Sequence, residues 1–143
     1  MLDFKPISLD DRNDIEKYFN FLEEPFCDFS FGNLFFWSVV ENTNIAFYGY
    51  FLFIRFSYDE NFYYTFPIGN GEIKNAINLI LEYAKLNNKK IKFVCLNKNQ
   101  TKILKENFEE EIIINKKRDA FDYTTHLQTL CILVNYFHLF LHK

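Results

Sequence analysis

Two periods of hydrophobic positions divide the chain into helices and strands. Apolar residues recur every three to four positions after the polar segment at 10–14, after Ser30 and after Gly71, which is the spacing of a helix with one buried face. Between residues 45 and 66 they alternate or run together, as is typical of strands. The pattern predicts strands at 4–9, 45–48, 50–57, 62–66, 91–96 and 111–115 and helices at 10–22, 72–87 and 99–108, with a further helix after Ser30.

The segment 72–87 carries the firmest helical pattern in the chain. Six apolar residues fall on one face and are expected to pack on the sheet: Ile73, Ala76, Ile77, Ile80, Leu81 and Ala84. For the helix after Ser30, we expect the Ser30 side chain to cap the first turn. Four apolar residues of that helix are expected to share its buried face, with Trp37 wedged against the sheet: Phe31, Leu34, Phe35 and Val39.

The order of these elements predicts an α/β (α+β) fold with a mixed β-sheet flanked by helices. Turn residues at Gly49 and at 58–61 favour an antiparallel meander of three strands. The helix at 72–87 is then expected to lead to the strand at 91–96 by a parallel crossover. A length of 143 residues is enough for one domain with a single buried core, which we place at residues 1–122.

Composition adds little to this picture. The 19 Phe and 9 Tyr are interpreted as core residues, with an aromatic binding surface as the alternative. The three cysteines (Cys27, Cys95 and Cys131) form no closely spaced pair, and the three histidines all lie near the C-terminus. We therefore expect reduced cysteines, no metal site and no cofactor. The acidic, polar N-terminus is unlike a signal peptide, so a cytoplasmic location is expected.

Charge is distributed unevenly along the chain. Residues 1–84 carry 5 basic and 13 acidic side chains, a net charge of −8, whereas residues 85–118 carry 10 basic and 4 acidic side chains, a net charge of +6. A basic block can attract an anionic partner such as RNA or a lipid head group. Solvation of exposed helix and loop surfaces is the simpler interpretation, and the sequence favours it.

Three motifs resemble a known family. They are SFGNLFFW at 30–37, FPIGNGEIKNAI at 66–77 and RDAFDY at 118–123. Together with the order of elements they resemble the family of the phosphatidylglycerol lysyltransferase C-terminal domain. That family is similar to the Fem-type aminoacyltransferases and has two domains in tandem, each with a GNAT-like fold of the acyl-CoA N-acyltransferase type. The resemblance covers residues 1–123 and only the first half of the family.

The resemblance implies transfer of an aminoacyl group, often from aminoacyl-tRNA, to a lipid, amine or hydroxyl acceptor. We expect the chain to be the N-terminal GNAT-like half of such a protein, inactive by itself and lacking its second GNAT-like domain. Two alternatives remain: a non-enzymatic GNAT-like binding module and a free-standing acyl-CoA N-acetyltransferase. The residues themselves assign no catalytic group. Ser30, Asn33 and Trp37 also suit a helix cap, a packing polar group and a core ring.

The turn Gly69-Asn70-Gly71 is the one candidate binding site. In GNAT enzymes the loop at this place binds the pyrophosphate of acyl-CoA, and glycines allow a phosphate to approach the N-terminus of the following helix. However, no basic side chain supports the turn, and Glu72 places a carboxylate where it repels a phosphate. A structural turn that starts the helix is therefore the favoured interpretation, with anion binding as the alternative.

The segment 123–143 differs from the rest of the chain. Lys143 is its only charged residue, whereas 24% of the whole chain is charged. The 15 residues Leu127–Leu141 are too few for a membrane span and are interrupted by Asn135 and His138. Contact of this segment with a membrane surface is disfavoured because its apolar residues fall on every face. Our hypothesis is a truncation or frameshift that replaced the second domain.

Overall fold

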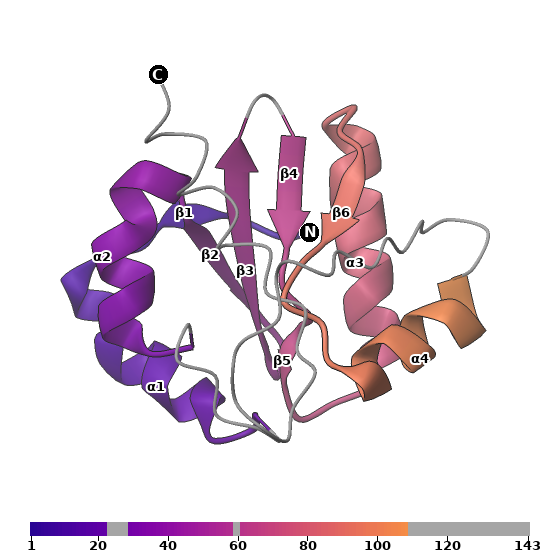
Figure 1. Ribbon diagram of the computed structural model, residues 1–143, viewed down its shortest axis with the longest axis horizontal. Coiled ribbons are helices and arrows are strands. Elements are labelled where there is room, and N and C mark those ends of the chain that lie inside the picture. Colours follow the sequence, from indigo (N-terminus) through magenta and orange to yellow (C-terminus); the bar gives the residue numbers. More distant parts are fainter. Residues whose placement is uncertain (23–28, 59–60, 109–143) are drawn as a thin grey trace. The chain divides into compact units, whose positions relative to one another are not determined.

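The computed structural model describes residues 1–22, 29–58 and 61–108 (Figure 1). The chain divides into two compact units, residues 1–91 and 92–143. The predicted strand at 111–115, the predicted domain boundary at residue 122 and the segment 123–143 lie outside the described residues.

The first unit is built on an antiparallel sheet. Four of its strands pair in chain order, and each is antiparallel to the next: β1 (Lys5–Pro6), β2 (Asn44–Tyr48), β3 (Phe51–Tyr58) and β4 (Asn61–Tyr64). The short strand β5 (Ile68–Gly69) also pairs antiparallel with β3. Tyr48 is the partner of Phe51, so β2 and β3 are joined by a two-residue turn in which Gly49 has a φ of +59°. A positive φ at this turn suits glycine.

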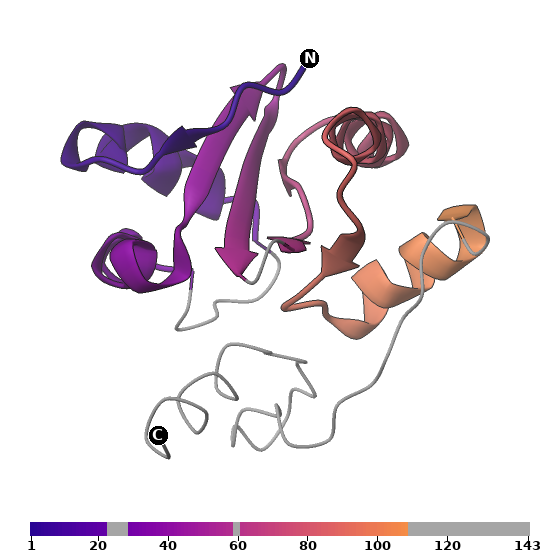
Figure 2. The same cartoon turned by 90° about the horizontal axis from the view of Figure 1, so that it is seen from above.

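Three helices cover the two faces of this sheet. One side is covered by α1 (Arg12–Phe19) and α2 (Phe31–Glu41), and the other by α3 (Ile73–Leu86) (Figure 2). A 3-10 turn at Leu9–Asp11 precedes α1. The Ser30 hydroxyl accepts a hydrogen bond from the Asn33 amide at 3.2 Å, so Ser30 caps α2 as predicted.

The core of the first unit lies between the sheet and these helices. The first six residues of β3 are buried, which explains why that strand is a continuous apolar run rather than an alternating one. Helix α3 buries one face against the sheet through four of its predicted residues: Ala76, Ile77, Ile80 and Ala84. The prediction for 72–87 is thus confirmed, with Glu72 as the N-cap residue of the helix.

The second unit contains helix α4 (Lys98–Phe108), and strand β6 (Ile91–Phe93) begins at the last residue of the first unit. Asn97 and Gln100 cap α4 reciprocally. The backbone N–H of Gln100 donates to the side-chain oxygen of Asn97 at 2.8 Å. The backbone N–H of Asn97 donates to the side-chain oxygen of Gln100 at 3.0 Å. Leu104 and Phe108 form the buried face of α4. With six strands and four α-helices in the described residues, the predicted α/β class is confirmed.

Four sequence predictions need correction. The strand predicted at 91–96 ends at Phe93, because Cys95 has a φ of +55° that takes the chain out of an extended conformation. The strand predicted at 4–9 is only Lys5–Pro6, and Leu9 lies exposed in the following turn. The strand predicted at 62–66 ends at Tyr64. Val39, expected on the buried face of its helix, is 90% exposed.

Candidate functional site

The predicted turn Gly69-Asn70-Gly71 lies where the sheet ends and α3 begins. Gly69 is the last residue of β5 and is the partner of Phe51 in β3. The Asn70 amide donates to the Tyr50 carbonyl at 3.3 Å, so this amide is used in holding the turn against β3. The sequence did not predict β5, because a strand of two residues has too little pattern to be recognised.

Both glycines are required by close packing against β3. A Cβ atom on Gly69 would lie 1.9 Å from the Tyr50 carbonyl oxygen, and one on Gly71 would lie 2.7 Å from the ring of Phe51. These distances are far below van der Waals contact, so neither position accepts a side chain without movement of the backbone or of the Phe51 ring. Each glycine therefore has a structural reason that is independent of any ligand.

The electrostatics of the turn oppose a phosphate. Glu72 is the N-cap residue of α3, and its carboxylate accepts a hydrogen bond from the Asn75 side chain at 2.7 Å. A negative charge therefore already occupies the positive end of the helix dipole. These contacts favour the structural interpretation of the turn. Anion binding by Gly69, Asn70 and Gly71 stays a prediction.

A second cluster, which the sequence analysis missed, surrounds Arg55 of β3. The guanidinium carbon lies 4.2 Å from the centre of the Phe62 ring and 4.6 Å from that of Phe4. A guanidinium nitrogen donates to the Tyr83 hydroxyl of α3 at 2.7 Å. We call these four residues the Arg55 cluster. The sequence signal was present, because Arg55 is the only charged residue between Glu41 and Asp59 and lies in an otherwise apolar strand.

The positive charge of Arg55 is balanced by ring faces rather than by a carboxylate. The side chain is buried, and its Nε has no hydrogen-bond partner. Within the described part of the chain, no acidic side chain forms an ion pair with it. Aromatic faces attract a guanidinium by about 0.5–2 kcal/mol each, and the attraction increases as the pair is removed from water. The cluster thus joins residue 4, β3, β4 and α3. Arg55 is 8% exposed, whereas the three rings around it are half-buried.

Two titratable groups among the described residues have a shifted pKa. Burial and neighbouring side chains account for both shifts. Burial raises the pKa of Tyr64, and the nearby charge of Arg55 only partly opposes this. Burial also acts to raise the pKa of Asp11, but hydrogen bonds from Lys5 and Ser8 outweigh it and lower that pKa below its usual value of 3.8. Asp11 holds the turn before α1 against β1, which is a structural arrangement.

The described ranges, 1–22, 29–58 and 61–108, contain no group of three or more His, Cys, Asp or Glu side chains that could hold a metal. Cys95 is buried and forms no disulfide with another described residue. None of the helices in these ranges has both the length and the apolar composition that crossing a bilayer requires.

The family described as phosphatidylglycerol lysyltransferase, C-terminal, matches residues 19–135, which is about four fifths of the chain. The chain belongs to this family. All three sequence motifs, the glycine turn, Arg55, Phe62 and Tyr83 lie inside the matched range. The match ends at residue 135, within the segment 123–143.

One solved relative of this lysyltransferase-family chain is a conserved protein of unknown function from Bacteroides thetaiotaomicron VPI-5482. Its crystal structure matches with a TM-score of 0.77 and 29% sequence identity, over 85% of this chain. The chain spans only 40% of the length of that protein. A comparison with curated proteins found no match.

Proposed function

We propose that the chain is the first GNAT-like half of an aminoacyltransferase-like protein. The whole protein would transfer an aminoacyl group from aminoacyl-tRNA to a lipid or amine acceptor in the cytoplasm. The observation that carries this proposal is the family match over residues 19–135. The family takes its description from a phosphatidylglycerol lysyltransferase. In such an enzyme the transferred group is an amino acid and the acceptor is a lipid head group.

We propose further that this chain is inactive by itself. Its two clusters of interest, the glycine turn and the Arg55 cluster, are occupied by packing contacts within the first unit. A chain that spans 40% of its solved relative has room for only part of a site built by the whole protein. Transfer of the aminoacyl group, as distinct from binding of the tRNA, would therefore require the remainder of such a protein.

The basic block offers a surface for the tRNA donor. Lys85 lies in the last turn of α3, and Lys89 and Lys90 come after the helix has ended at Leu86. Within the described residues none of the three forms an ion pair. The Lys89 ammonium lies 5.6 Å from the centre of the Phe62 ring, next to Arg55. Basic side chains that neutralise phosphates supply most of the affinity for a nucleic-acid backbone.

Binding of charged tRNA tests the proposal. The full chain should bind lysyl-tRNA in a gel-shift assay, and the Lys89→Glu, Lys90→Glu double variant should bind more weakly. Its slope of log affinity against log salt should fall by about 1 for each phosphate that the variant no longer neutralises. The control is Lys74→Glu, which reverses one charge at an exposed lysine in the first turn of α3. Absence of tRNA binding to the wild-type chain would refute this part of the function.

The two alternative functions give different results. A free-standing acyl-CoA N-acetyltransferase should bind acetyl-CoA in a calorimetric titration, and we expect no heat of binding from this chain. A non-enzymatic GNAT-like module should bind neither acetyl-CoA nor charged tRNA. Transfer is assayed with radiolabelled lysyl-tRNA and phosphatidylglycerol vesicles. The chain alone should give no labelled lipid.

A further inference from the structure

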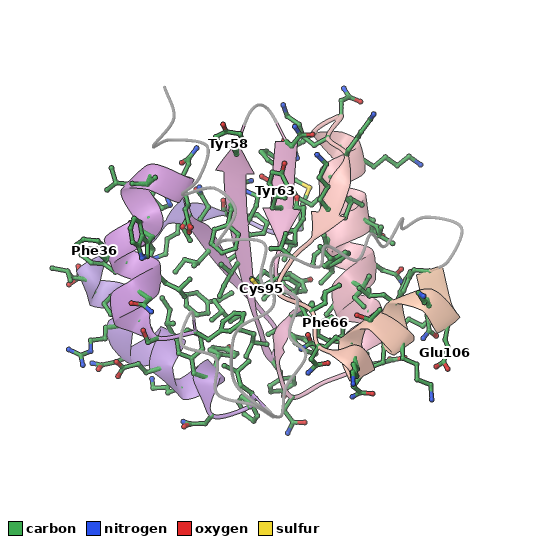
Figure 3. All side chains as sticks on the ribbon, in the orientation of Figure 1. Phe36, Tyr58, Tyr63, Phe66, Cys95 and Glu106 are labelled. Atoms are coloured by element: carbon green, nitrogen blue, oxygen red, sulfur yellow. The ribbon has the colours of Figure 1, made fainter. Side chains whose placement is uncertain are left out.

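The outer face of α2 is apolar and exposed to solvent. Phe36, Val39 and Val40 form this face and are 72%, 90% and 62% exposed. Figure 3 shows Phe36 on the side of α2 that points away from the sheet. Phe36 also packs edge-on against Trp37, with ring centres 5.2 Å apart. We call Phe36, Val39 and Val40 the α2 outer face.

This face is unusual for a surface helix. The solvent side of a helix normally carries charged or polar residues, yet α2 has no charged residue before Glu41, its last. Phenylalanine, valine and the glycine at position 32 are also poor helix formers, so the helix gains little stability from its own sequence. Its apolar surface suits contact with another apolar surface.

The net charge of this region favours a protein over a membrane as the partner that covers this face. A helix that binds a bilayer surface is usually flanked by lysine and arginine, which attract anionic lipids. The region that contains α2, residues 1–84, has a net charge of −8. A phosphatidylglycerol bilayer is negatively charged and would repel it. A folded polypeptide with an apolar surface meets no such repulsion.

The length of the solved relative points to the polypeptide that covers the α2 outer face. The chain matches 40% of the Bacteroides protein with a TM-score of 0.77, so most of that protein lies beyond the matched fold. We propose that the α2 outer face is the docking surface for the second folded part of such a protein. The inference rests on the proposed half-protein role but does not depend on the transfer chemistry.

A chimeric protein tests the docking surface. This chain replaces the matched part of the Bacteroides protein, and thermal unfolding is followed by calorimetry. The unsubstituted chimera should unfold in a single transition, because docked domains unfold together. The Phe36→Asp, Val39→Asp variant should unfold in two transitions, because it places two carboxylates in the interface. The same substitutions in the 143-residue chain should leave its midpoint within about 2 °C, because both side chains are exposed.

The matched control carries the same charge change elsewhere. Leu9 and Leu86 are both 66% exposed, and the Leu9→Asp, Leu86→Asp chimera should keep the single transition. If both acidic chimeras unfold alike, the docking surface is wrong. If sedimentation of the 143-residue chain instead shows a dimer that the Phe36→Asp, Val39→Asp variant abolishes, the occupant is a second copy and the proposal is overturned.

Inspection of the Bacteroides crystal structure remains decisive even if the chimera does not fold. The helix that superposes on α2 should have more than half of its surface covered by the part of that chain beyond the match. A solvent-exposed helix there would contradict the proposal. Docking without transfer in the chimera would leave this inference intact and count against the aminoacyltransferase function, so the two proposals fail separately.

Discussion

Helices α2 and α3 lie on opposite sides of the same sheet and use their apolar residues in opposite ways. In α3 the buried residues form one face, and its exposed residues are almost all polar. In α2 only Phe31 and Leu34 are buried, whereas Phe36, Val39 and Val40 are exposed. Apolar periodicity locates a buried face only when the opposite face is polar. Where a helix is apolar all round, the sequence predicts the helix but not its orientation.

The difference has an energetic consequence. The side chains Ile77 and Ile80 of α3 are fully removed from water, so they contribute to the stability of the first unit. The exposed side chains of α2 contribute little to it. Four substitutions, in order of decreasing expected effect, test this contrast.

The largest effect is expected in α3. Ile80→Ala removes a side chain that is 1% exposed and leaves a cavity against the sheet. The free energy of unfolding should fall by about 2–5 kcal/mol, measured by urea denaturation of the full chain. A decrease below about 1 kcal/mol would show that α3 is not packed as described and would remove the contrast with α2.

The second effect compares a glycine before α3 with a glycine inside α2. Gly69→Ala should lower the free energy of unfolding by about 1–3 kcal/mol, because its Cβ would meet the Tyr50 carbonyl oxygen. Gly32→Ala is the matched control, because a Cβ there meets no atom within 4 Å. It should raise the free energy of unfolding by about 0.5–1 kcal/mol, since alanine is the better helix former. Equal effects of the two substitutions would contradict the packing of the turn.

The third effect concerns the α1 and α2 side of the sheet. Asp11→Asn should lower the free energy of unfolding by about 1–2 kcal/mol at pH 7, because the carboxylate accepts bonds from Lys5 and Ser8. Its folded-state pKa is lowered, so this stabilisation is present above the unfolded pKa of 3.8 and is lost as pH falls through the folded-state pKa.

Denaturation at several pH values checks the sign of this dependence. The stabilities of the wild-type chain and of Asp11→Asn should converge below pH 3.8 and differ most near neutral pH. Asp14→Asn is the control, because the Asp14–Lys17 ion pair is exposed and should contribute little. A difference that grew on acidification would mean that Asp11 is not stabilised as a carboxylate.

The smallest effect is expected on α2. Val39→Ala should change the free energy of unfolding by less than about 0.5 kcal/mol, because the side chain has almost no buried area. The unique tryptophan, Trp37, lies on the same helix and reports its environment, so the fluorescence emission maximum should not shift. A decrease comparable to that of Ile80→Ala would show that Val39 is buried in solution.

Several features could be predicted from local pattern alone. The α/β class, the family, the helix at 72–87 and the cap at Ser30 all followed from residue spacing or short motifs. Turn chemistry also located the β2–β3 hairpin at Gly49. For the candidate site, the sequence found the glycine turn and the unfavourable charge of Glu72. Each of these depends on residues close together in the chain, so their spacing carries the information.

Other features depended on which distant segments meet. The steric need for Gly69 and Gly71 comes from Tyr50 and Phe51 across the sheet. The Arg55 cluster gathers residues 4, 62 and 83 around one strand, and no spacing in the sequence relates them. The exposure of Val39 was decided by how α2 rotates onto the sheet. By itself the sequence determined the periods, turns and family, because these are local properties. Only the tertiary structure decided partners and exposed faces, because burial depends on contacts between segments that are far apart in the chain.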